Sequence, residues 1–242
     1  MGSILVLAGK EFRGYFQSWV AYLFVAIFFV ACFSLFFFVE KFLGVERAEV
    51  RGLFAWLPLT LALLVPGLTM RQWAREREMG SIETLLTLPA TPGQLVLGKF
   101  LGCLGLVAVA LVFTLGFPIT AEILGDLDWG PVIGGYAAAM LLGAAYVAIG
   151  LFVSSWFADQ FIALVAAGAI CVALAVLSSD MVLAWAEGHG LLRDTLAFFG
   201  FWKRFDSIER GVLDFRDVGF YLSVTALFLA LNAFRLRLMR WS

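Results

Sequence analysis

Apolar residues dominate the chain in long runs, and short polar segments separate these runs from one another. Six of the runs hold about 18 residues or more, the length that an α-helix needs to cross the hydrocarbon core of a bilayer. The predicted spans cover residues 19–39, 53–70, 95–121, 132–152, 161–183 and 218–236. This pattern predicts an all-α polytopic membrane protein with six transmembrane helices, built as a single transmembrane domain over residues 1–242.

The first 18 residues follow a different pattern, with apolar positions on one side of a helix and polar positions on the other. The apolar face consists of Leu5, Ala8, Phe12, Tyr15, Phe16 and Trp19. Lys10, Arg13 and Gln17 fall on the opposite face. Amphipathic helices of this kind lie in the membrane surface. We therefore expect residues 1–18 to form an interface helix before the first span, with an ordinary cytosolic lead-in as the alternative.

The polar segment 71–94 is longer than a plain connection between two spans requires. Its charged residues are Arg71, Arg75, Glu76, Arg77, Glu78 and Glu83. We expect the helix of the second span to continue past Arg71 through Glu78 and to end at Gly80, because glycine is a poor helix former. The second span also contains Pro58 and Pro66, which free backbone carbonyl groups and bend helices.

A second, shorter helix is predicted after Gly80. Ser81 is a suitable N-cap and Glu83 an acidic residue in the first turn, where the helix dipole favours negative charge. Pro89 ends the helix, and residues 91–94 (TPGQ) match a capping box that starts the third span. The apolar face of this short helix consists of Ile82, Leu85, Leu86 and Leu88.

These leucines lie outside the predicted spans, so no lipid covers them. An exposed apolar patch that is surrounded by charge is typical of a protein contact. The segment is therefore predicted to dock on a soluble partner. The candidate docking residues are Glu76, Glu78, Gly80, Ser81, Ile82, Glu83, Thr84, Leu85 and Leu86.

The distribution of basic residues favours one orientation in the membrane. With both termini on the cytoplasmic side, the cytoplasmic segments contain nine Lys and Arg residues and the outer segments eight, five of which lie in the long loop 184–217. Long loops count little in the positive-inside rule. We therefore expect both termini and the segment 71–94 to be cytoplasmic.

The outer loop 184–217 carries apolar residues at helical spacing on both sides of Gly200. They are Leu191, Leu192, Leu196, Phe198, Phe199, Phe201, Trp202, Phe205 and Ile208. We expect two short helices in the outer interface, either as part of the interfacial aromatic belt or as a gate at an exit. Asp214 or Asp217 is expected to cap the last span. The acidic turn before the fourth span is expected to end at Gly130-Pro131.

Candidate chemistry inside the membrane is sparse. The chain is 62% apolar and only 14% charged, well outside the usual range of soluble domains. The predicted spans hold no Asp, Glu, Lys, Arg or His at depth, and Asn232 is the most polar residue well inside a span. Proton-driven carriers normally use intramembrane carboxylates or histidines. An ion-coupled secondary carrier is therefore disfavoured, although a sodium site made of backbone carbonyl groups stays open.

Residues 93–100 (GQLVLGKF) resemble the spacing of a nucleotide-binding P-loop. Phe100 stands where a hydroxyl is needed, and no strand precedes the segment. We interpret it as the start of the third span and expect the chain to have no ATP site, cofactor or metal and to be no enzyme. The energy for any transport would then come from a partner.

Several motifs together give the chain a family resemblance. The most specific is residues 76–89 (EREMGSIETLLTLP), followed by Gln94 and Gly98-Lys99. Supporting matches are Lys10-Glu11, residues 210–214 (RGVLD) and Arg240-Trp241. On these residues the whole chain resembles the ABC-2 family of transporter permeases, most closely the gliding-motility type and more distantly the permease of nitrous-oxide-reductase maturation.

The resemblance implies a function and a set of partners. It implies a membrane-spanning permease of a type-2 exporter-like ABC transporter in the bacterial inner membrane, with segment 71–94 carrying the coupling helix. It implies two copies of an ABC ATPase that bind ATP and Mg²⁺, and a second permease chain, identical or related. An envelope or periplasmic accessory protein fits the same organisation, and no nucleic acid is expected. The alternative function is a mechanical membrane subunit that acts on an envelope partner, and transport in ATPase-containing liposomes would separate the two.

Two further features of the spans are candidates for a role. The phenylalanine-rich first span and Asn232 give a candidate substrate path of Phe29, Phe33, Phe36 and Asn232, with lipid-facing phenylalanine as the alternative. The pairs Gly98/Gly102 and Gly130/Gly134 have the G-x-x-x-G spacing that allows helices to approach closely, although such spacings are common in glycine-rich spans.

Overall fold

The computed structural model describes residues 2–39, 51–80, 90–125, 127–185, 195–196, 200–209 and 214–241. The described residues are mostly helical and contain no strand, which confirms the all-α prediction. The helices are α1 (Gly2–Phe16), α2 (Trp19–Ser34), α3 (Arg51–Ala55), α4 (Leu57–Glu78), α6 (Pro92–Phe113), α7 (Gly116–Leu124), α8 (Trp129–Ser154), α9 (Gln160–Val176), α10 (Asp180–Trp185), α12 (Phe201–Glu209) and α13 (Phe215–Trp241). A π-helical turn, η1 (Leu35–Val39), extends α2.

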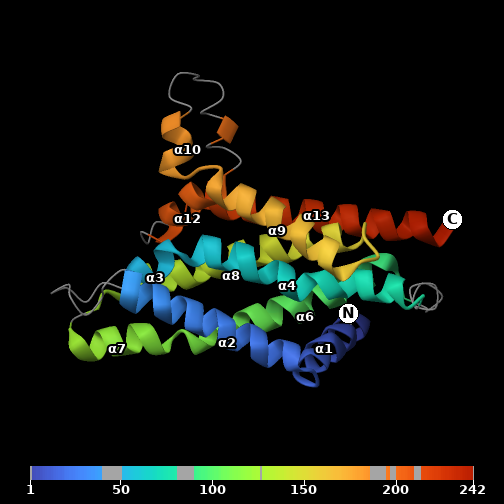
Figure 1. Cartoon of the computed structure of the whole chain (residues 1–242), viewed down its shortest axis with the longest axis horizontal. Helices are drawn as coiled ribbons and strands as arrows, with labels where there is room; N and C mark the ends of the chain where they lie inside the picture. The colour runs from blue at the N-terminus through green and yellow to red at the C-terminus, as the bar shows by residue number, and fades with distance from the viewer. Residues whose placement is uncertain are drawn as a thin grey trace.

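The long helices run side by side and form one bundle (Figure 1). Helix α4 packs against α8, α9 and α2, and α8 also packs against α13, α6 and α12. Both ends of the chain, α1 and the C-terminal end of α4 lie at one end of the bundle, which we call the α1 end (Figure 1). Helices α3, α7, α10 and α12 lie toward the opposite end. Both termini and Gly80 thus share one end, as the predicted topology requires.

Four helical stretches among the described residues are long and apolar enough to cross a membrane: Trp19–Phe38, Pro92–Leu124, Trp129–Ser154 and Phe215–Met239. Helix α9 is apolar but has only 17 residues. Helix α4 has 22 residues, but its apolar part is followed within the same helix by charged residues. Because α4 and α9 lie in the bundle beside the four stretches, the structure supports a multi-pass protein, and the count of six spans stays a prediction.

The second and fourth spans begin differently from the prediction. The second was predicted to start at Leu53 as one helix, but a break at Trp56 separates α3 from α4, because Pro58 has no N–H and its ring would clash with the carbonyl group of Phe54 in a continuous helix. Gly130-Pro131 does not end the acidic turn, since α8 already begins at Trp129. The Asp128 side chain accepts the Gly130 N–H at 2.9 Å and caps this helix.

The third predicted span is not one continuous helix. It was predicted over residues 95–121, but the helix stops at Phe113 and restarts at Gly116. Pro118 explains the break, because a proline in a helix clashes with the carbonyl group four residues earlier, here that of Thr114. The Thr114 carbonyl group instead accepts the Phe117 N–H at 3.0 Å.

The fifth predicted span, residues 161–183, is also interrupted. Helix α9 ends at Val176 and α10 begins at Asp180. The Ser178 hydroxyl between them accepts the Lys203 N–H of α12 at 3.2 Å, and Gly200 lies so close that a Cβ there would be 2.1 Å from the Ser178 Cβ. The break therefore makes room for Gly200 and the start of α12 beside Ser178.

Helix α12 is the second of the two short helices predicted in loop 184–217. Phe201, Phe205 and Ile208 are buried, so its apolar face packs into the bundle. The Arg204 guanidinium donates to Asp217 Oδ1 at 2.8 Å and ties α12 to α13. Of the two candidate caps, Asp214 accepts the Arg216 N–H at 2.9 Å. The first short helix, apart from Thr195 and Leu196, lies outside the described residues.

Candidate functional site at the end of α4

Helix α4 continues beyond its apolar part and carries charged residues to the α1 end of the bundle. It runs through Glu78, as predicted, and the Met79 N–H bonds to the Arg75 carbonyl group at 3.0 Å. Gly80 follows with a φ of 64°, a left-handed conformation that glycine adopts without steric cost. The chain therefore leaves the helix at the residue that the sequence marked as a breaker.

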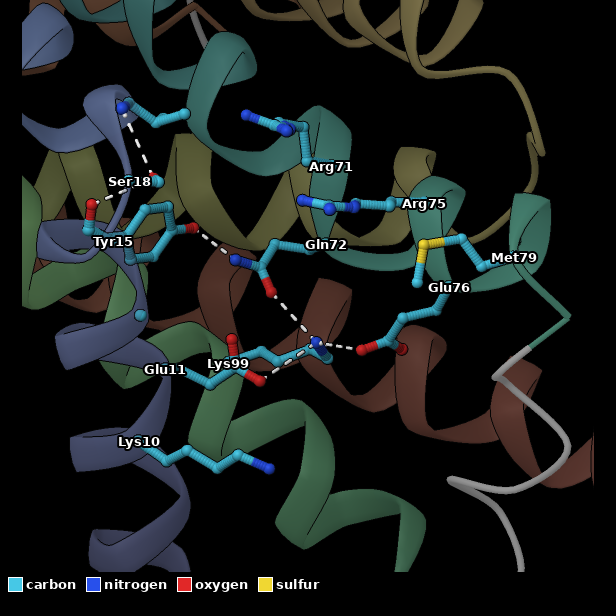
Figure 2. Close-up of a pocket in the computed structure, with 12 residues that line it drawn as sticks. Lys10, Glu11, Tyr15, Ser18, Arg71, Gln72, Arg75, Glu76, Met79 and Lys99 are labelled. Atoms are coloured by element: carbon cyan, nitrogen blue, oxygen red, sulfur yellow. Dashed lines mark hydrogen bonds and ion pairs between the residues drawn. The ribbon is translucent and has the colours of Figure 1, made fainter.

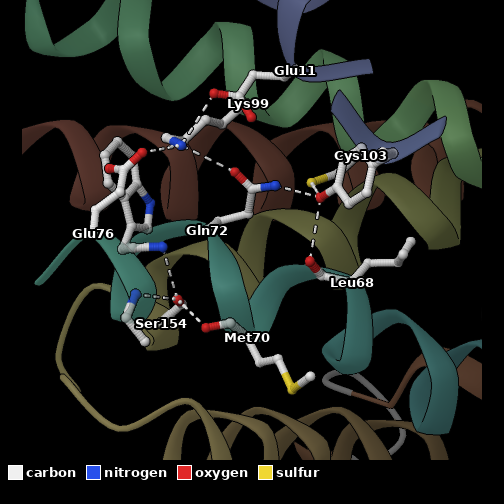
Figure 3. A network of polar contacts seen from close by, with 11 residues as sticks. Glu11, Leu68, Met70, Gln72, Glu76, Lys99, Cys103 and Ser154 are labelled. Carbon is white, nitrogen blue, oxygen red and sulfur yellow. Dashed lines mark hydrogen bonds and ion pairs between the residues drawn. The ribbon is translucent and has the colours of Figure 1, made fainter. Parts of the chain in front are cut away.

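Lys99 of α6 joins three helices at this end of the bundle (Figure 3). The side chain is almost fully buried, and its Nζ lies 2.7 Å from Glu76 Oε1, 3.2 Å from Glu11 Oε1 and 3.2 Å from Gln72 Oε1. The same Nζ lies 4.9 Å from the centre of the Trp73 ring. A single cation thus connects α6 to α1 through one carboxylate and to α4 through a second.

Tyr15 of α1 adds another buried link to α4. Its hydroxyl donates to the Leu68 carbonyl group at 3.2 Å and accepts a hydrogen bond from the Gln72 side-chain amide. It also lies 3.0 Å from the Cys103 Sγ of α6. Burial raises the pKa of the Tyr15 phenol well above its usual value, so the phenol keeps its proton and its capacity to donate.

Ser154 at the end of α8 binds the backbone of α4 on a different side (Figure 3). Its hydroxyl accepts the N–H groups of Trp73 and Ala74, at 3.2 and 3.3 Å, and donates to the Met70 carbonyl group at 3.0 Å. One turn earlier in each helix, Gly150 faces Thr69 so closely that a Cβ would lie 2.1 Å from the Thr69 hydroxyl oxygen. Helix α8 therefore approaches α4 closely and bonds directly to its main chain.

The last turn of α4 contacts α9 and the residue that follows α8. The Arg77 guanidinium donates to the Ser155 carbonyl group at 3.0 Å. The Glu78 carboxylate accepts the Gln160 side-chain amide at 2.8 Å. Together with the contacts of Lys99, Tyr15 and Ser154, these bonds connect residues 68–78 of α4 to α1, α6, α8 and α9.

Charge at this site is costly to bury. Burial raises the pKa of the Glu76 carboxyl above its ordinary value, even though the nearby Lys99 ammonium lowers it. A charge in a buried position is stable only if its partners remain in place. The buried charges at the end of α4 thus depend on the ion pairs that Lys99 makes with Glu11 and Glu76.

Comparison with known families identifies the chain. A model of the family described as "ABC-2 family transporter protein" matches residues 5–231, which is nearly the whole sequence. The chain belongs to the ABC-2 transporter family. It is therefore a multi-pass membrane permease of an ABC transporter. No curated protein matches the sequence.

The ABC-2 match covers the docking segment, but the structure describes only part of it. Glu76, Glu78 and Gly80 lie at the end of α4, whereas Ser81, Ile82, Glu83, Thr84, Leu85 and Leu86 lie outside the described residues. Glu76 turns inward to Lys99, while Glu78 is exposed beside α9. The capping box that follows the segment is confirmed, with Thr91 and Gln94 bonding reciprocally at 3.0 and 3.3 Å.

The four residues of the predicted substrate path do not form one group in this permease. Phe29 and Phe33 are partly exposed, Phe36 is buried, and all three rings surround Phe117 of α7 with centroids 5.3 to 6.3 Å from it. Asn232 is fully buried in α13, which packs on α8 and α6. These phenylalanines therefore connect α2 and η1 to α7.

The glycine pair Gly98/Gly102 makes the close contact that its spacing allowed. A Cβ at Gly98 would lie 2.7 Å from the Leu7 Cβ, and one at Gly102 would lie 2.8 Å from the Glu11 Cβ. The partner is α1. At Gly130 the nearest atom to a Cβ is the Asp128 side chain that caps α8.

Sequence reasoning missed the buried polar cluster of this permease. Lys99 was read as a basic residue near the start of a span, and Glu11, Tyr15 and Gln72 had no assigned contacts. One signal was available: a lysine in the second turn of an apolar helix requires a partner. The sequence does not show which carboxylate supplies it, because Glu11 is 88 residues away.

Proposed function

We propose that this permease is one half of a type-2 exporter-like ABC transporter whose movements are driven through the segment after α4 by a separate ATPase subunit. One observation carries the proposal. Residues 68–78 of α4 are bonded to α1, α6, α8 and α9 immediately before Gly80, where the predicted docking segment begins. A force on that segment would therefore act on four helices at once.

The same arrangement suggests where the energy enters. Residues 93–100 form the first turns of α6, and the Lys99 ammonium is held by Glu11 and Glu76, so it is not presented to a nucleotide. This supports a chain without catalytic activity whose partner ATPase binds ATP and Mg²⁺. Two permease chains and two ATPase chains would make the complete transporter, in the bacterial inner membrane with both termini cytoplasmic, and the gliding-motility type is the subtype that we favour.

The proposal is tested by introducing a charged side chain into the predicted contact with the ATPase. In Leu85→Asp, an unpaired carboxylate would enter the interface with the ATPase, which typically costs several kcal/mol. The variant is expected to insert into the membrane at normal levels but to lose the ATPase during purification and to lose function in cells. Native mass spectrometry of the purified complex measures how much ATPase stays bound.

Glu46→Lys, in the short predicted outer loop, is the control and is expected to keep two ATPase chains for every two permease chains. Retention of a full set of ATPase chains and full activity by Leu85→Asp would show that the docking assignment is wrong. An active wild-type complex with a single permease chain would show that the proposed stoichiometry is wrong.

A further inference from the structure

A cavity of about 400 Å³ lies between α1 and the charged part of α4 (Figure 2). Its size falls in the range of small-molecule sites. The polar cluster described above forms one wall, through Glu11, Tyr15, Gln72, Glu76 and Lys99. The remaining lining includes residues that no contact described so far employs.

The cavity carries excess positive charge. Its lining includes four cationic side chains, Lys10, Arg71, Arg75 and Lys99, against two carboxylates, which leaves a net charge of +2. Both carboxylates are already paired with Lys99. Among the described residues, Lys10, Arg71 and Arg75 form no ion pair, so three cations are available to a ligand.

Arg71 and Arg75 are arranged to meet one anion. Arg71 and Arg75 are four residues apart, so they lie on the same face of α4. Figure 2 shows both guanidinium groups directed from α4 toward α1, one above the other, whereas Lys10 lies below Lys99 in this view, on the other side of Lys99 from the two arginines. Guanidinium groups bind phosphate oxygens through paired, charge-assisted hydrogen bonds. The arrangement therefore selects a phosphate rather than a cation or a neutral molecule.

The position of the cavity favours a lipid as the source of that phosphate. Arg71 follows directly after the apolar part of α4, and Ser18 and Val20, at the junction of α1 and α2, also line the cavity. Trp19 and Tyr22 beside this junction are 87% and 57% exposed, as aromatic side chains at a membrane surface often are. The cavity thus lies at the depth of lipid headgroups, where anionic lipids attract clustered Lys and Arg.

We propose that this cavity binds the phosphate of an anionic lipid headgroup, held by Arg71 and Arg75, with Lys10 adding to the positive charge of the lining. The inference rests on the placement of α1 at the membrane surface and not on the ATPase contact. The bound headgroup would fill the space between α1 and α4, and its negative charge would neutralise part of the excess positive charge of the lining. Occupancy would therefore strengthen the link between the interface helix and the helix that leads to the docking segment.

The experiment measures thermal unfolding of the purified permease in a neutral detergent. The added probes are dioctanoyl phosphatidylglycerol, dioctanoyl phosphatidylcholine and inorganic phosphate at equal concentrations. A ligand that binds only the folded state raises the Tm, so the phosphatidylglycerol is expected to raise it by several degrees and the other two probes to leave it unchanged. Arg71→Gln and Arg75→Gln are each expected to raise the half-saturating concentration about tenfold or more, as loss of a charge-assisted hydrogen bond does.

Arg13→Gln is the control, because Arg13 is an exposed cation of α1, the helix that faces these two arginines, and it does not line the cavity. It is expected to leave the phosphatidylglycerol shift unchanged. Native mass spectrometry of the same variants counts bound phosphatidylglycerol and does not depend on their stability. An equal loss of binding in Arg13→Gln, an equal shift with inorganic phosphate alone, or no shift with any probe would each overturn the proposal.

Discussion

Lys99 shows how much one side chain contributes to the α1 end of the bundle. Its ammonium is shared by Glu11 of α1 and by Gln72 and Glu76 of α4, and it lies over the Trp73 ring. Because it is nearly fully buried, its removal would leave two carboxylates facing one another with little water to screen them.

Replacement of Lys99 by Met keeps most of the side-chain length and removes the charge. Breaking a buried ion pair in this way typically costs about 3–5 kcal/mol, so the Tm of the purified permease is expected to fall clearly below that of the wild type. Lys203→Met, at an exposed position of α12, is expected to have little effect. The combination of Lys99→Met with Glu11→Gln and Glu76→Gln should recover part of the loss, since no unpaired charge remains. A Lys99→Met variant as stable as the wild type would contradict the assigned role.

At this scale the sequence predicted the residues that act locally and missed those that act across the chain. The Thr91–Gln94 capping box and the break at Gly80 depend on neighbours within a few residues, and both are present. Glu11, Tyr15 and Gln72 act through partners 27 to 88 residues away. Helical periodicity gives the face of a helix on which a residue lies but not the helix that meets this face.

At the scale of helices, the close packing of α1 against α6 depends on glycine residues of α6, which have no side chain at the contact. A Cβ at Gly102 would lie 2.8 Å from the Glu11 Cβ and 3.3 Å from the Phe12 backbone nitrogen. Since the backbone has little room to yield, Gly102→Ala is expected to push α1 away from α6 and to lower stability by about 1–3 kcal/mol, as overpacking does. The measurement is the Tm in detergent.

Gly93→Ala is the control on the same helix, because a Cβ there meets nothing within 4 Å. It is expected to leave the Tm unchanged or to raise it slightly, since alanine has the better helix propensity. If Gly102→Ala were as stable as Gly93→Ala, the close packing of α1 on α6 would be disproved.

Gly80 sets the point where α4 ends. With a φ of 64°, Gly80→Ala would cost about 1–2 kcal/mol in this conformation and would favour continuation of the helix. On the proposed function, the variant is expected to keep ATP hydrolysis by the complex but to transport less for each ATP. Gly80→Asn is the matched control, because asparagine adopts the left-handed conformation more readily. Equal transport for each ATP in both variants would contradict a role for this turn.

The sequence predicted the helices better than their interruptions. The predicted end of α4 at Glu78 and the predicted start of the third span both agree with the structure. The breaks after Phe113 and Val176 were missed. Pro118 lies four residues beyond the first break, and the second is occupied by Gly200 and α12, so only tertiary packing reveals it.

For the whole molecule, the topology makes a labelling prediction. Met79 is 62% exposed at the α1 end, so Met79→Cys is expected to react with a membrane-impermeant maleimide only after the cells are opened, whereas His189→Cys is expected to react in intact cells. The three native cysteines are buried and should stay unlabelled in the unmodified chain, which serves as the control. Labelling of Met79→Cys in intact cells would show that the predicted orientation is wrong.

The bundle as a whole followed from the lengths of the apolar runs, but its internal order did not. Run length and basic residues predicted an all-α membrane protein with both ends of the chain on one side. They did not predict that α8 would pack against α4, α6, α9, α12 and α13, because an apolar helix looks the same in sequence whether it faces protein or lipid.

The spacing of the polar contacts along the chain has a consequence for synthesis. Glu11 meets Lys99, and Pro58 meets Tyr146, across 88 residues in each case, while Ser154 meets Met70 across 84. At about 5–20 residues per second, each early partner waits roughly 4 to 18 seconds before its counterpart is made. During that interval the polar group of the early partner lacks the contact that it makes in the finished protein. A ribosome that stalls before residue 99 therefore leaves a chain in which Glu11 lacks the cation that it meets in the finished protein.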